Sequence, residues 1–125
     1  MSSGLASNAN THVGIYRTDA QGRCVFVNKA FCELFELQAE EALDLGWLHR
    51  IHPSDRDRVL KAREKAISPL PSFYLECRLQ LSARTIWVSA FSTALLERGE
   101  FKGRSGMVTP IPAPSKPLHQ PQAPR

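Results

Sequence analysis

The chain has 125 residues, which is enough for one domain that buries roughly two-thirds of its unfolded surface without disulfides or a structural metal. Apolar residues make up 42% and charged residues 22%, as in ordinary soluble globular proteins, and no apolar run approaches the ~18 residues that span a bilayer. The formal net charge is +4, but Lys116 and Arg125 near the C-terminus supply two of these charges, and the remainder forms no basic stripe of the kind that binds nucleic acid.

Three cysteines, Cys24, Cys32 and Cys77, lie within apolar segments. Their number is odd and none forms a CxxC pair, which indicates reduced core residues and therefore a cytoplasmic protein. Residues 1–12 are rich in Ser, Asn and Ala and lack the regions of a signal peptide, so we expect them to be disordered. We expect no membrane partner.

Composition also sets the domain boundaries. Six of the nine prolines lie from Pro110 onward, and such a segment cannot build a core. The sequence therefore predicts one domain at residues 13–111 and a proline-rich disordered tail at 112–125. One weak PxxP match in this tail is a candidate polyproline II ligand.

The N-terminal part predicts a hairpin followed by a helix. Strands at 13–18 and 23–27 flank a turn that begins with Asp19 and ends with Gly22. Asn28 is a typical N-cap for a helix at 29–35, whose apolar spacing of i, i+3, i+4 predicts core contacts from Phe31, Leu34 and Phe35.

A second short helix at 39–43 leads into a loop that points apolar residues inward and then to a helix that ends near Ile67. Pro53 prevents a helix from running through, and Ser54 is a good N-cap with Asp57 three residues later. Capping explains His52, Asp55 and Asp57 better than a metal site does. Ser54, His52 and Asp55 are also too close along the chain for a catalytic triad, so we expect neither metal ligands nor catalytic residues.

The C-terminal part predicts three strands. Apolar and polar residues alternate over 73–81, and both faces of the strand at 84–96 are apolar, which places it centrally in a sheet. Glu76 and Arg78 share a strand face and could pair with each other or with Arg56 and Asp55. The element order predicts an α+β fold, an antiparallel sheet with short helices on one face.

Several short motifs follow one another along the chain: Gly14-Ile15-Tyr16-Arg17-Thr18-Asp19, Val27-Asn28-Lys29-Ala30-Phe31, Glu40-Glu41-Ala42-Leu43, Trp47-Leu48, Ile51-His52-Pro53-Ser54-Asp55-Arg56, Phe73-Tyr74-Leu75-Glu76-Cys77-Arg78-Leu79 and Ile86-Trp87-Val88. In the order of these motifs, the chain resembles a PAS domain of the bacterial sensory type over about residues 13 to 111. One departure is Pro110, which stands where the family often has the Asp of an Asp-Ile-Thr triplet.

This resemblance implies a five-stranded antiparallel sheet that encloses a pocket with the helices, and a role in sensing and protein contact rather than catalysis. The candidate pocket-lining residues are Phe26, Asn28, Phe31, Phe35, Trp47, Ile51, Leu75, Cys77 and Val88. The signatures of haem-binding and light-oxygen-voltage flavin relatives are absent, so we expect no such prosthetic group. An empty, well-packed interior and a small metabolite both remain open.

The candidate interaction surface is the sheet face that carries Trp87, Phe91 and Leu95, which we expect to contact a protein partner or a second copy. For Trp87 itself, a plain surface position is an equal alternative, and Asn28 is also explained as a cap. Because no effector segment is evident, we expect the module to act through a partner. The alternative is a small-molecule-binding or enzymatic protein on the same scaffold, and a nucleic-acid role ranks third.

Overall fold

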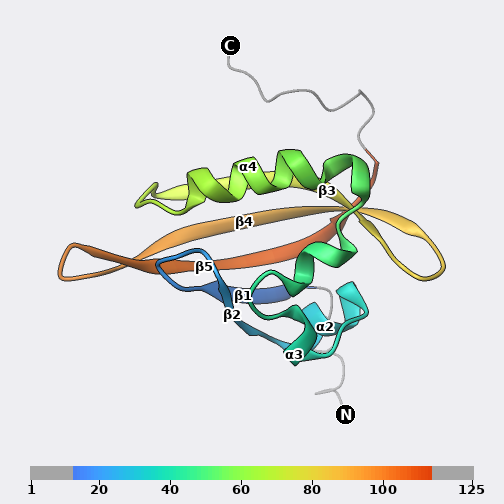
Figure 1. The fold of residues 1–125 in the computed structure, drawn as a ribbon, viewed down its shortest axis with the longest axis horizontal. Coiled ribbons are helices and arrows are strands. Elements are labelled where there is room, and N and C mark those ends of the chain that lie inside the picture. Colours follow the sequence, from blue (N-terminus) through green and yellow to red (C-terminus); the bar gives the residue numbers. More distant parts are fainter. Residues whose placement is uncertain (1–12, 114–125) are drawn as a thin grey trace, which may run out of the picture.

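A computed structural model of the chain describes residues 13–113 (Figure 1). The predicted disordered N-terminus, residues 1–12, lies outside the described residues, and so does the predicted tail from residue 114 onward.

A five-stranded antiparallel sheet forms the body of the domain, as the sequence predicts. Its strands are β1 (Gly14–Thr18), β2 (Cys24–Val27), β3 (Ser72–Gln80), β4 (Thr85–Glu97) and β5 (Glu100–Ile111), in the order β2-β1-β5-β4-β3. The last strand, β5, lies between β1 and β4, so the two ends of the domain meet at the centre of the sheet. The core therefore depends on pairing between strands from the N-terminal and C-terminal parts of the domain.

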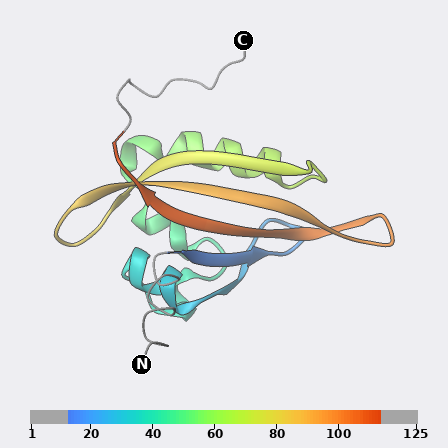
Figure 2. The same ribbon diagram turned by 180° about the vertical axis from the view of Figure 1, so that it is seen from behind.

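The helices within residues 13–113 lie on one face of this sheet. They are α2 (Lys29–Phe35), α3 (Ala39–Ala42), α4 (Arg56–Ala66) and two 3-10 turns, η1 (Gly46–Arg50) and η2 (Pro53–Asp55). Figure 1 shows α2 and α3 beside β1 and β2, and α4 beside β3. Figure 2 shows the opposite face, with the strands in front of the helices. The η1 turn occupies the segment that the sequence predicts as a loop. No helix within residues 13–113 is long and apolar enough to cross a membrane.

Asn28 caps α2, as predicted, and also holds this helix against β1. Its Oδ1 accepts hydrogen bonds from the amides of Phe31 and Ile15, each at 2.9 Å. Gly14 allows the close approach, because a Cβ at this position would lie 2.9 Å from the Cα of Phe31. One polar side chain thus fixes both the start of the helix and its place on the sheet.

The segment from Ile51 to Asp55 covers the outer edge of β3. The amide of His52 donates to the carbonyl of Arg78 at 2.9 Å, and Ile51 forms an isolated bridge with Leu79. The Asp55 carboxylate accepts from the backbone amide of Arg78 at 2.8 Å and from its guanidinium at 3.1 and 2.6 Å. An edge that would otherwise expose unpaired backbone groups is therefore covered by the chain itself.

The predicted capping by Ser54 is wrong. The amide of Ser54 donates to Nδ1 of His52 at 3.1 Å, so His52 caps η2, and α4 begins only at Arg56. Asp55 occupies the N-cap position of α4, but its side chain makes no capping hydrogen bond, because Arg78 engages its carboxylate. Local sequence favoured a cap, but a residue far along the chain provides a charged partner, and charge-assisted hydrogen bonds are stronger than neutral ones.

Candidate functional site

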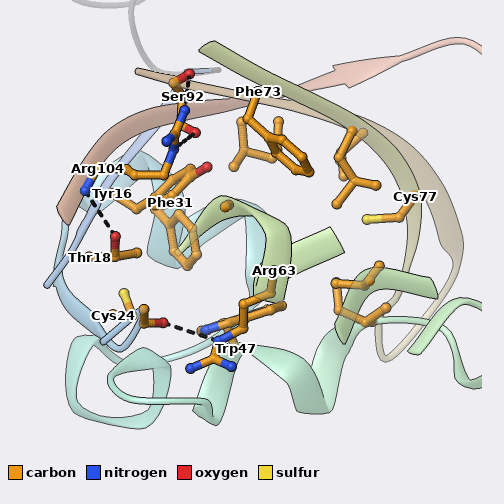
Figure 3. A pocket seen from close by; sticks show the side chains of 18 of the residues that line it. Tyr16, Thr18, Cys24, Phe31, Trp47, Arg63, Phe73, Cys77, Ser92 and Arg104 are labelled. Carbon is orange, nitrogen blue, oxygen red and sulfur yellow. Dashed lines mark hydrogen bonds between the residues drawn. The ribbon is translucent and has the colours of Figure 1, made fainter. Parts of the chain in front are cut away.

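A cavity of about 130 Å³ lies between the inner face of the sheet and the helices (Figure 3). Side chains of β1, β3, β4 and β5 form its floor, α2 and η1 form one wall, and α4 forms the other. Seven of the predicted pocket residues line it: Phe31, Phe35, Trp47, Ile51, Leu75, Cys77 and Val88. These side chains make most of the cavity apolar.

The other two predicted pocket residues lie outside the cavity. Phe26 is 46% exposed. It pairs with Arg17, so it shares the outward face of the sheet, whereas its neighbour Val27 points inward. The Asn28 side chain is used in holding α2 to β1, as described above. In a four-residue strand at the sheet edge, apolar side chains point to both faces, and the sequence pattern does not show which side faces the core.

Four polar residues gather at one side of the cavity: Tyr16, Thr18, Ser92 and Arg104 (Figure 3). Arg104 is 3% exposed. Its guanidinium donates from Nε to Oγ of Ser92 at 2.8 Å, from Nη2 to the Ser92 carbonyl at 3.2 Å, and from Nη1 to the Ser68 carbonyl at 3.1 Å. Its backbone amide donates to Oγ1 of Thr18 at 3.1 Å.

The register of the sheet explains this polar cluster. Arg104 lies opposite Thr18 on β1, and the next inward position, Gly106, lies between Tyr16 and Ser92. A Cβ on Gly106 would lie 2.5 Å from the Tyr16 hydroxyl oxygen. The missing side chain therefore leaves the space that the tyrosine ring occupies beside the arginine.

The cavity is positively charged. Two arginines, Arg63 and Arg104, are among the residues that line it, and none of the lining residues within 13–113 is Asp or Glu. Burial raises the pKa of Tyr16, an effect only partly offset by Ser92 and Arg104, and burial raises the pKa of Cys77 to about 12. The phenol and this thiol are therefore neutral near pH 7. Burial also lowers the pKa of Arg104, although an arginine remains protonated in proteins.

Arg63 connects α4 to the turn between β1 and β2. Its Nε donates to the Gly22 carbonyl at 3.1 Å, and its Nη2 donates to the Gln21 carbonyl at 3.4 Å. In Figure 3, Arg63 and Trp47 lie on the side of the cavity away from Ser92. The arginine thus closes the cavity where a helix and a turn meet.

Sequence reasoning did not identify the polar cluster, although a signal was present. In β5, alternation places Arg104 in phase with Gly106 and Val108, and Val108 belongs to the core. A charged residue in phase with a core residue of a central strand is unusual and indicates a buried polar site. Tyr16 and Ser92 carry no comparable signal, because both residues are common on either face of a strand.

The opposite face of the sheet carries the predicted interaction residues. Phe91 is 40% exposed and lies in a row across four strands with Tyr74, Met107 and Ile15. Trp87 and Leu95 are half-buried. The Arg78 guanidinium lies 5.3 Å from the ring centroid of Trp87, so Trp87 also supports the ion pair at the edge of β3.

No three His, Cys, Asp or Glu side chains converge on a possible metal position within residues 13–113. The structure is thus a single antiparallel sheet of order 2-1-5-4-3, covered by helices on one face, with a small, mostly apolar cavity between the two layers. The chain belongs to the family described as the PAS fold, whose model matches residues 6–111. No curated protein matches the sequence.

Several solved structures share this fold. The PAS domain of a protein from Colwellia psychrerythraea is 19% identical, with a TM-score of 0.64, and the match covers 86% of this chain and 96% of that one. The N-terminal domain of a diguanylate cyclase with PAS/PAC sensor from Marinobacter aquaeolei is 14% identical, with a TM-score of 0.68 and coverage of 78% and 94%. A sensory box histidine kinase/response regulator from Burkholderia thailandensis is 22% identical, with a TM-score of 0.61 and coverage of 89% and 85%.

Proposed function

We propose that this chain is a bacterial, cytoplasmic sensory module that binds a small molecule in its cavity and signals to a protein partner, or to a second copy, through the outer face of the sheet. The cavity between sheet and helices is the observation that carries the proposal. Membership of the PAS fold family supports it. Two structures of similar fold, from a diguanylate cyclase with PAS/PAC sensor and from a sensory box histidine kinase/response regulator, agree with a role in signalling.

The size of the cavity supports a small ligand rather than a large prosthetic group. A volume of about 130 Å³ is close to the ~150 Å³ apolar cavity that holds benzene. A haem or a flavin would need its walls to move apart. We therefore propose no such group for this cavity.

The same residues favour binding over catalysis. General acid–base chemistry uses groups that titrate near neutral pH, most often histidine or a carboxylate. Among the described residues, those that line the cavity include no histidine and no carboxylate. Two of them, Tyr16 and Cys77, have pKa values raised by burial. An enzymatic role on this scaffold, or a role with nucleic acid, has no comparable support.

The test is an absorbance spectrum of the freshly purified full chain, with mass spectrometry of a denatured extract from the same sample. We expect no visible band and a small organic molecule in stoichiometric amount. A visible band would contradict the absence of a prosthetic group. A colourless protein that releases no molecule, and shows no chemical-shift changes at cavity residues with a mixture of small fragments, would contradict sensing through the cavity.

A further inference from the structure

The guanidinium of Arg104 is buried with neutral partners alone. In the part of the chain that the structure describes, its acceptors are the hydroxyl and carbonyl of Ser92 and the carbonyl of Ser68. Among the described residues, no carboxylate oxygen lies within 4.0 Å of its nitrogen atoms, the distance of an ion pair. The neighbouring phenol of Tyr16 is neutral near pH 7. A buried charge is unfavourable unless an opposite charge accompanies it, so this position fits an anion.

Arg104 also retains N–H donors for a further acceptor. A guanidinium has five N–H groups, and three of them have acceptors within residues 13–113. The two others belong one to each terminal nitrogen, Nη1 and Nη2. One remaining N–H on each terminal nitrogen is a donor available to the oxygens of a carboxylate.

The rest of the cavity fits an apolar body. Its volume of about 130 Å³ corresponds to a ring or chain of about six carbon atoms, by comparison with the cavity that holds benzene. Beyond the polar cluster, the walls are aromatic and aliphatic side chains such as Phe31, Leu75 and Val88. A phosphate would need more donors than two N–H groups to replace its hydration, whereas a carboxylate on an apolar body matches both ends of the site.

We infer that the cavity binds a small monocarboxylate, with its carboxylate on Arg104 and its apolar body against the aromatic and aliphatic walls. This inference rests on the proposed function, since it names the class of ligand for the same cavity. Benzoate and hexanoate have the required size and charge. Benzyl alcohol and 1-hexanol have nearly the same shape without the charge.

The test is isothermal titration calorimetry of the full chain with these four probes at neutral pH. We expect each carboxylate to bind at least tenfold more tightly than its alcohol. Arg104→Gln should reduce the affinity for benzoate at least tenfold. Arg17→Gln should leave it unchanged, because this control removes the same charge from the exposed outer side of β1.

A third variant keeps the result decisive if Arg104→Gln does not fold. Ala90 lines the cavity floor, so Ala90→Leu should fill the space, keep Arg104 and abolish benzoate binding. Equal affinity for acid and alcohol, with loss of both in Ala90→Leu, would overturn the carboxylate inference but retain a ligand cavity. Absence of binding by all four probes, or unchanged benzoate binding in Ala90→Leu, would overturn the inference. The proposed function is tested separately, by mass spectrometry of the denatured extract of the purified protein.

Discussion

Asp55 is the one acidic residue that is buried among the described residues. Its carboxylate is 5% exposed and accepts three hydrogen bonds from Arg78, while Arg58 lies 3.5 Å away. It thereby joins the segment before α4 to the edge strand β3. The Arg78 side chain is 30% exposed, so water still reaches one partner, but the acid itself depends on the protein.

Asp55→Asn should therefore lower the free energy of unfolding by about 2–4 kcal/mol, because it leaves the guanidinium of Arg78 without its charged partner. Urea denaturation measures this change. The matched control is Asp57→Asn, an exposed acid in the first turn of α4, for which we expect a loss of at most about 1 kcal/mol. Equal losses in the two variants would contradict the importance of the Asp55–Arg78 pair.

The same pair predicts a dependence of stability on pH. Burial alone raises the pKa of Asp55, but hydrogen bonds and the charge of Arg78 outweigh it, so the pKa lies below its ordinary value. A carboxyl whose pKa is depressed on folding stabilises the protein fully above its unfolded value of about 3.9, and this stability is lost as the pH falls through the folded-state pKa.

The free energy of unfolding, measured from pH 6 down to pH 3, should therefore fall less steeply in Asp55→Asn than in the unchanged chain. Asp19 and Glu36 also have lowered pKa values, but both are present in the two proteins. The difference between the two curves isolates Asp55. Parallel curves would show that its folded-state pKa is not depressed.

At the scale of elements, the helix α4 is held against the rest of the domain in a different way from the other helices. Of its eleven residues, only Val59 is fully buried. Arginine side chains supply the other links, with Arg58 donating to the Glu76 carbonyl at 2.8 Å and Arg63 to the Gly22 carbonyl. Few apolar contacts and partly exposed hydrogen bonds characterise segments that open locally. Since α4 forms one wall of the cavity, we expect its local opening to admit the proposed ligand.

We predict that backbone amides of α4 exchange with solvent faster than those of β4 and β5. Arg63→Met should increase exchange in the second half of α4 about tenfold, because a hydrogen bond from a charged group contributes about 1.5 kcal/mol. Hydrogen–deuterium exchange with mass spectrometry measures this effect. Lys61→Met, an exposed change on the same helix, is the control. An equal increase in both variants would show that Arg63 does not hold α4 closed.

The elements themselves were largely predictable from the sequence, because their signals are local. Alternation over residues 73–81 and the Asn28 cap place β3 and α2 within one residue of their observed limits. The site was less predictable, because it depends on register. Arg104 becomes part of the cavity only when β5 pairs with β1 and β4, and Asp55 becomes an ion-pair partner only when Arg78 is brought beside it.

At the scale of the whole molecule, the two faces of the sheet differ in the surroundings of their side chains. The inner face forms the core and the cavity floor. On the outer face, Ile15, Met107, Phe91 and Tyr74 form one row across β1, β5, β4 and β3. Three of these side chains are at least 40% exposed. Contiguous exposed apolar side chains commonly mark a contact with another protein.

The strands that form this row also form the floor of the cavity. Phe91 lies between Ala90 and Ser92, which both line the cavity from the other side of β4. A ligand that shifts the inner side chains therefore acts on the same backbone that presents Phe91. In the proposed function, this continuity gives a short physical connection from ligand to partner, and it carries a signal when the strand has two arrangements that the ligand distinguishes.

Phe91→Glu should therefore abolish self-association, or binding to the partner, without unfolding the domain. A charge on the apolar row would have to be buried in the contact, which costs several kcal/mol when it is unpaired. Phe91 is a better position to test than Trp87, because Trp87 lies under the Arg78 guanidinium and its replacement would also disturb the Asp55–Arg78 pair. Sedimentation velocity over a range of concentrations measures the association, and thermal unfolding checks the fold.

Leu45→Glu is the matched control for this experiment, because Leu45 is 37% exposed, close to the 40% of Phe91, but directly precedes η1 on the helical side. If the contact uses the outer sheet face, the control variant should associate like the unchanged chain while Phe91→Glu remains monomeric. Loss of association in both variants would indicate a general effect of added charge. If both variants still associate, the contact does not use the outer face of the sheet. The helical layer around the cavity would then be the surface to test next.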